Sequence, residues 1–161
     1  MTDIDPQLGF LRHAVATLAY RAARALHHAP PGFADFAAGD SLRTPGQILA
    51  HMGDLFDWAR SIAEGQPQWR ESQRLPWTQE IDRFFAGLKA FDELLASGTV
   101  LHAPEERLFQ GPVADALTHV GQIAMLRRLA GSPVKGENYF VAEISAGLVG
   151  IDQPVPRRTF E

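Results

Sequence analysis

Apolar residues recur three and four positions apart along four segments of the chain, which is the period of an α-helix with one buried face. Alternation with a period of two never persists, so strands are expected to be few. The pattern predicts an all-α fold, an up-down four-helix bundle. The four apolar stripes are Leu11, Val15, Leu18 and Leu26; Ile48, Met52, Leu55 and Ile62; Ile81, Phe84, Leu88 and Leu95; and Val113, Ala116, Val120 and Ile123.

Capping signals mark the ends of the first two helices. Asp5 followed by Pro6 is typical of an N-cap with proline in the first turn. The second helix begins with Thr44-Pro45-Gly46-Gln47, a capping box in which the first and fourth residues satisfy each other's backbone amides. We expect the first helix to end at Pro30-Pro31-Gly32 and the second at Gly65-Gln66-Pro67.

The last two helices have less distinct starts. The third is predicted to begin near Thr78 and to end at Ser97-Gly98. The fourth is predicted to begin at Gly111-Pro112 and to end at Gly131, which suits a left-handed C-cap.

These elements fit one domain of ordinary length. We place the bundle in residues 5–131 of a single domain that covers residues 1–161. Residues 132–161 are expected to form a short, partly irregular C-terminal extension, in which residues 142–148 favour a short helix.

Composition narrows the classes of function. The net charge of −4 and the lack of a basic stripe argue against a nucleic-acid partner. No apolar run approaches the ~20 residues that cross a bilayer, and Met1-Thr-Asp-Ile-Asp5 lacks the layout of a secretory signal. The chain has no cysteine, which excludes thiolate nucleophiles and cysteine zinc sites and fits a reducing cytoplasm. We therefore expect a cytoplasmic protein without membrane contact.

A few polar residues interrupt the apolar faces. His51 lies beside the stripe of the second helix, where it is either a core histidine with a polar partner or a ligand. Asp115 and His119 project from one face of the fourth helix on successive turns, and Gln122 continues that line. Such a row either faces solvent or lines a polar site, and its alanine- and leucine-rich context favours a site. The remaining histidines have ordinary positions: His13, His27, His28 and His102.

Asp115 and His119 can place two ligands around one ion, and His51 from a facing helix would supply a third. A carboxylate with two imidazoles suits zinc, nickel, iron(II) or manganese. Three protein ligands leave coordination positions open, as in reactive sites.

Two stretches also resemble a known family. They are TPGQILAHMGDLFDW at residues 44–58 and DALTHVGQIAMLRRLAG at residues 115–131. Their sequence and order resemble the DinB-like superfamily of metal-binding four-helix bundles. The resemblance implies His51 and His119 as metal ligands. Many members have a histidine where this chain has Asp115, which is therefore either a carboxylate ligand, as we expect, or the mark of a lost site.

The resemblance also implies a function. Characterised members include metal-dependent thiol transferases and isomerases that use low-molecular-weight thiols, so we expect a metal-dependent thiol S-transferase or a related detoxifying enzyme. Its partners would be such a thiol and a small electrophile, and its cofactor zinc or nickel, with iron or manganese as alternatives. The alternatives are a non-catalytic, stress-associated metal-binding protein and a structural or interaction bundle whose polar row is a satisfied core network.

Further residues have two readings. Asp54 either orients a ligand through a hydrogen bond or lies at the surface. Tyr139 and Glu143 are expected to border the open coordination positions. We expect a homodimer, and the aromatic residues of the connections either support it or cover the ends of the core: Phe33, Phe36, Trp69 and Trp77.

Overall fold

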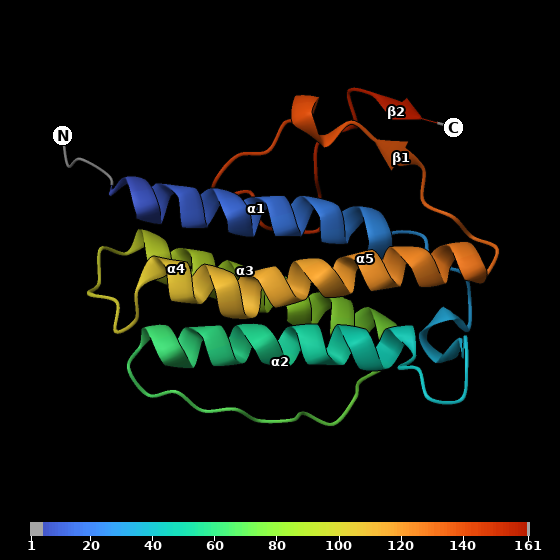
Figure 1. The fold of residues 1–161 in the computed structure, drawn as a ribbon, viewed down its shortest axis with the longest axis horizontal. Coiled ribbons are helices and arrows are strands. Elements are labelled where there is room, and N and C mark those ends of the chain that lie inside the picture. Colours follow the sequence, from blue (N-terminus) through green and yellow to red (C-terminus); the bar gives the residue numbers. More distant parts are fainter. Residues whose placement is uncertain (1–4, 161) are drawn as a thin grey trace.

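The computed structural model describes residues 5–160, and it is mostly helical. Figure 1 shows α1, α5 and α2 lying alongside one another, with α3 behind them. The all-α prediction is confirmed at this level. The long helices are α1 (Pro6–Leu26), α2 (Pro45–Ala63), α3 (Trp77–Ala96) and α5 (Ala114–Leu129); the short elements are η1 (Phe33–Asp35), α4 (Glu105–Leu108), η2 (Phe109–Val113), β1 (Gly136–Glu137), η3 (Tyr139–Val141) and β2 (Thr159–Phe160).

The predicted caps at the starts of α1 and α2 are present. The Asp5 carboxylate accepts a hydrogen bond from the Gln7 amide at 2.8 Å. The Thr44 amide donates to the Gln47 side-chain oxygen at 2.9 Å, and the Gln47 amide donates to the Thr44 hydroxyl at 3.3 Å, which completes the capping box. These bonds fix where α2 begins, at Pro45, and so set the position of His51 on the helix.

The fourth helix begins earlier than predicted. It starts at Glu105 as α4, widens into the π-helical turn η2 and continues as α5, so the prediction of a start at Gly111-Pro112 is wrong. A glycine-proline pair usually marks a helix start because proline lacks a backbone donor. Here Pro112 lies inside η2, where the wider turn accommodates it. The predicted end is correct, because Gly131 has a left-handed φ of 77°.

The buried apolar residues form one core between the long helices. α2 packs against α3 and α5, and α1 packs against the same two helices. At the centre, the Phe56 ring meets those of Phe84 and Phe91 edge-on, with centroids 5.9 and 5.8 Å apart. Burying each such side chain stabilises the fold by about 1.5–3 kcal/mol. This packing places α2 directly beside α5, and so brings His51 to the face that carries Asp115 and His119.

Most aromatic residues of the connections cover the core. Phe33 is buried and meets Trp77 edge-on at a centroid distance of 5.5 Å, and Phe36 packs against the core cluster. Trp69 is different, because it is partly exposed and lies against His51. A homodimer remains a prediction.

The C-terminal tail packs along α1, on the side away from α2 (Figure 1). β1 and β2 pair antiparallel, and Glu137 of β1 accepts hydrogen bonds from Tyr20 and from Arg24, the latter at 3.1 Å. The short helix predicted at residues 142–148 is absent, because Gly147 takes a φ of 91° in a turn that a helix cannot contain.

No helix in residues 5–160 has both the length and the apolar character to span a bilayer. Residues 1–4 of the acidic N-terminal segment lie outside the described part of the chain.

Candidate metal centre

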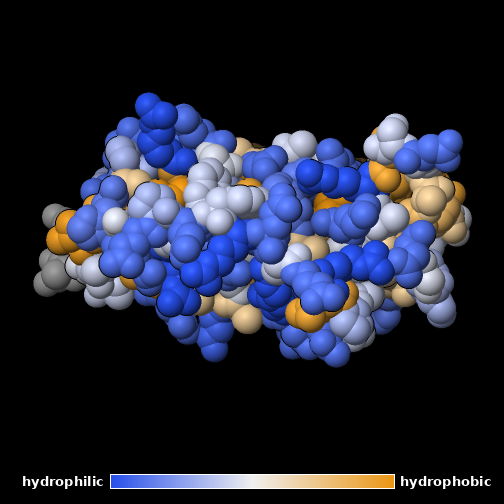
Figure 2. Space-filling view, turned by 90° about the horizontal axis from the view of Figure 1, so that it is seen from below, coloured by the Kyte–Doolittle hydropathy of each residue, from blue (hydrophilic) through white to orange (hydrophobic). Residues whose placement is uncertain are grey.

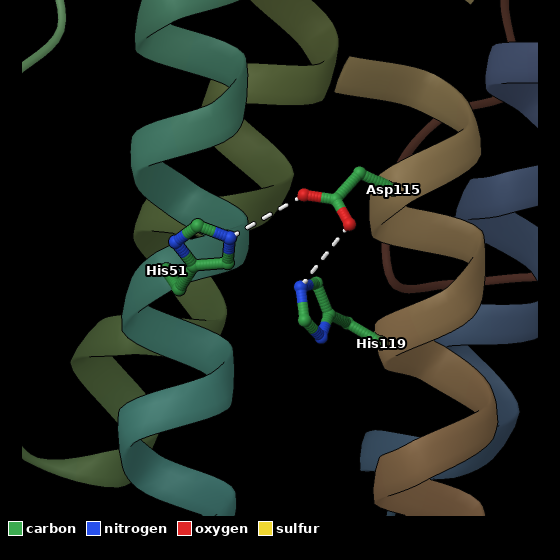
Figure 3. A group of neighbouring side chains, drawn as sticks. All are labelled: His51, Asp115 and His119. Carbon is green, nitrogen blue, oxygen red and sulfur yellow. Dashed lines mark hydrogen bonds and ion pairs between the residues drawn. The ribbon is translucent and has the colours of Figure 1, made fainter. Parts of the chain in front are cut away.

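Three side chains converge between α2 and α5 (Figure 3). Nε2 of His51 lies 3.4 Å from Oδ2 of Asp115, and Nε2 of His119 lies 3.4 Å from Oδ1 of the same carboxylate. The three ligand atoms all lie within 4.8 Å of one another. The structure therefore brings together the three residues that the sequence singled out.

The local shape of the fourth helix presents this face. Asp115 and His119 are one helical turn apart on α5, so both project toward α2. The π-helical turn η2 ends at Val113, two residues before Asp115. Such turns are frequent at functional sites. Apart from Pro112, no feature of the sequence indicated this turn.

The spacing of the three groups is compatible with a divalent ion and is long for direct hydrogen bonds. A nitrogen-to-oxygen hydrogen bond spans about 2.7–3.2 Å, so both distances of 3.4 Å are too long for good ones. Two ligand atoms that each lie about 2.0–2.1 Å from a tetrahedral ion are about 3.4 Å apart, and each imidazole Nε2 has this separation from a different oxygen of Asp115. Two imidazoles and a carboxylate also form a donor set that zinc, nickel, iron(II) and manganese accept. The residues present therefore fit a divalent metal.

Gln122 orients His119. Its side-chain oxygen lies 2.7 Å from Nδ1 of His119. Because an amide oxygen can only accept, Nδ1 donates the hydrogen and Nε2 presents its lone pair toward Asp115. This is the arrangement in which ligating histidines are usually held. The sequence placed Gln122 on the polar face of the helix but did not assign it this contact.

Aromatic rings surround His51. Its ring lies 4.9 Å from that of His119 and 5.5 Å from that of Trp69, measured between centroids. Trp69 also meets Trp58 of α2 edge-on at 5.8 Å. Trp69 belongs to the connection between α2 and α3, so this connection forms one wall of the centre.

A polar cluster holds that connection in place. Arg83 of α3 donates to the Ser72 hydroxyl at 2.7 Å and also to Asp54. The Ser72 hydroxyl donates to Asp54 at 2.7 Å. Asp54 is thus buried in a cluster that faces α3 and does not contact His51, so both earlier readings of this residue are wrong. Burial lowers the pKa of Arg83, but hydrogen bonds to Asp54 and Asp57 outweigh it and the net shift is upward.

The centre is open to solvent on one side. The side chain of His119 is 11% exposed, whereas those of His51 and Asp115 are 22% and 45% exposed. Water or a small molecule therefore reaches the centre past Asp115. If the three residues held one ion, a coordination position would be left for it.

Tyr139 and Glu143 do not border the centre. The Arg21 guanidinium lies over the Tyr139 ring, 3.9 Å from its centroid, and Glu143 pairs with Arg157. Both residues lie in the tail that packs along α1 (Figure 1), so the prediction that they flank the open positions is wrong. The physical reason is the β1–β2 pair, which together with Glu137 directs the tail to the far side of α1.

Comparison with family models, with curated proteins and with solved structures finds no match to this chain.

Proposed function

We propose that this chain binds one divalent metal ion through His51, Asp115 and His119, within an up-down four-helix bundle of the DinB-like kind. The observation that carries the proposal is the convergence of two imidazoles on one carboxylate. Each Nε2 lies 3.4 Å from a different oxygen of Asp115, which is long for a hydrogen bond and close to the separation of two ligands on one ion, and the three ligand atoms lie within 4.8 Å of one another. Zinc or nickel is the preferred ion, and iron(II) or manganese are the alternatives.

We further propose that the protein is a metal-dependent thiol S-transferase or a related detoxifying enzyme. When bound, a divalent ion favours the deprotonated form of a thiol. The nucleophile comes from a low-molecular-weight cosubstrate, which is consistent with a chain that contains no cysteine. The thiol gives its proton to solvent water, and its sulfur forms a bond to a carbon of a small electrophile as the leaving group departs with the electron pair of the bond that breaks.

The residues around the centre have separate tasks in this proposal. Gln122 holds the His119 ring so that Nε2 faces Asp115. Trp69 lies against the His51 ring and forms one wall of the centre. The partly exposed Asp115 borders the route by which the thiol and the electrophile enter.

Metal analysis tests the binding part of the proposal. Protein purified without chelator and reloaded with zinc or nickel should carry about one ion per chain. His119→Ala should lose the ion, whereas His13→Ala should keep it, because His13 is exposed on α1 and lies outside the centre. Full occupancy of His119→Ala, or near-zero occupancy of the unmodified protein, would reject the site.

Turnover assays test the reaction. The metal-loaded protein is screened with glutathione, mycothiol and bacillithiol against several small electrophiles. Metal-dependent consumption of thiol that His119→Ala abolishes would support the transferase. Stoichiometric metal without turnover would favour the non-catalytic metal-binding protein, and absence of both would favour a structural bundle.

The cytoplasmic homodimer also belongs to this proposal. The absence of cysteine supports a reducing compartment. Sedimentation equilibrium tests the oligomeric state: the mass of two chains is expected, and the mass of one chain would exclude the dimer.

A further inference from the structure

A pocket of about 430 Å³ lies beside His119, between α5 and the connection that leads into α2. One wall is a single face of α5, formed by His119, Gln122, Met125 and Leu129 at spacings of three and four residues. The opposite wall includes Leu42 and Arg43 of the connection. His119 of the candidate metal centre, and Gln122 that orients it, therefore also line this pocket.

The large apolar side chains around this pocket are exposed. Leu42, Met125 and Leu129 are 57%, 58% and 59% exposed, although all three are of types that normally lie in the core. The face in Figure 2 is mostly hydrophilic, and its hydrophobic atoms gather in small patches, one of them at the end where α2 begins. Apolar residues gathered around a hollow of this size are typical of a small-molecule site.

Arg43 adds a positive charge to the rim. Its side chain is exposed and makes no hydrogen bond or ion pair within residues 5–160. By contrast, the nearby Arg74 pairs with Asp35 at 2.6 Å. A guanidinium has five donors in a planar fork that matches a carboxylate, so Arg43 is available to bind an anionic group.

We propose that this pocket binds a small amphipathic molecule, with an apolar body against Met125 and Leu129 and a carboxylate on Arg43. The end of the molecule near His119 lies next to the candidate metal centre. The idea that this molecule is a substrate rests on the proposed function. Binding itself needs only the pocket and Arg43.

Calorimetry with decanoate as the probe tests the pocket, on the full chain in metal-free and zinc-loaded forms. Decanoate should bind, and 1-decanol should bind about tenfold more weakly because it lacks the charge. Arg43→Gln should weaken decanoate binding about tenfold and leave zinc affinity unchanged. Arg128→Gln is the matched control on α5, since Arg128 is exposed and lies outside the pocket. The decanoate affinity of this variant should differ from that of the unmodified protein by less than about twofold.

Two further measurements locate the probe. The imidazole NMR signals of His119 should shift when decanoate is added, and those of the exposed His13 should not. Leu129→Glu places a negative charge in the pocket at an exposed position, so it should abolish binding while the circular dichroism spectrum is kept.

Equal effects of Arg43→Gln and Arg128→Gln, or unmoved His119 signals, would overturn the inference. A decanoate affinity that falls as the protein concentration rises would also overturn the inference, because a second copy of the chain would then occupy the pocket. If zinc fails to bind but decanoate binding still depends on Arg43, the pocket stands and the proposed metal function fails. If zinc binds but decanoate does not, the pocket inference fails alone.

Discussion

Nδ1 of His119 donates a hydrogen bond to the side-chain oxygen of Gln122 at 2.7 Å. This contact fixes the tautomer of the most buried residue in the candidate metal centre and leaves its Nε2 available to an ion.

Replacing Gln122 should therefore weaken metal binding without unfolding the protein. Gln122→Ala is expected to lower zinc affinity about 10- to 100-fold, because the His119 ring loses its orientation. Gln122→Glu should retain most of the affinity, since a carboxylate also accepts from Nδ1. Competition with a fluorescent chelator measures the zinc affinity of both variants. Gln66→Ala is the control, at an exposed glutamine. Equal affinity of Gln122→Ala and the control would remove the orienting role.

Substitutions of Asp115 test whether its carboxylate is a ligand. Asp115→Ala should reduce zinc affinity about 100-fold or more, because only two protein ligands remain. Asp115→His should restore tight binding, since two histidines four residues apart on a helix can share one ion. The same competition assay applies. Undiminished affinity of Asp115→Ala would show that the two histidines suffice and that Asp115 is not a ligand.

The Arg83 cluster should be important for stability. Arg83→Leu is expected to destabilise the fold by about 3 kcal/mol, because it leaves the buried Asp54 carboxylate without its charged partner. Urea unfolding measures the change, and the tryptophan emission, to which Trp69 contributes, should shift as its connection loosens. Arg107→Leu is the control, at an exposed arginine outside the cluster. A loss below about 0.5 kcal/mol would mean that the cluster is a surface ion pair.

Stability should also fall in strong alkali through Tyr20. Burial, followed by the hydrogen bond to Glu137, raises the pKa of Tyr20 from 10.0 to about 12. Because the folded pKa lies above the unfolded one, the stabilisation is fully present below pH 10.0 and is lost as the pH rises to about 12. Two pKa units correspond to about 2–3 kcal/mol.

Thermal unfolding between pH 9 and 12 measures this effect. Tyr20→Phe should flatten the decline between pH 10 and 12, since it removes the titrating hydroxyl. An identical decline in Tyr20→Phe would assign it to other groups.

Local signals in the sequence were sufficient for the starts of the first two helices and their caps. Asp5 and the Thr44–Gln47 box act through contacts between close neighbours in the chain, so the sequence predicted them correctly. The start of the fourth helix was missed because Pro112 lies in a π-helical turn, an uncommon way to continue a helix.

In the candidate site, too, local features could be predicted from the sequence, whereas features set by long-range contacts could not. Asp115 and His119 share a face by their spacing alone, and the helical period predicted this directly. The roles of Asp54 and Trp69 depend on the path of the connection after α2, which is set by Arg83 in α3. Tyr139 and Glu143 were misplaced because the tail follows a long-range contact between Glu137 and α1 that no local pattern reveals.

The central claim is that one ion binds between α2 and α5. A crystal structure of the zinc-loaded protein, with an anomalous difference map at the zinc absorption edge, tests it most directly. We predict one peak about 2.0–2.2 Å from Nε2 of His51, Nε2 of His119 and an oxygen of Asp115. Zinc-loaded crystals with no peak among these three side chains would contradict the claim.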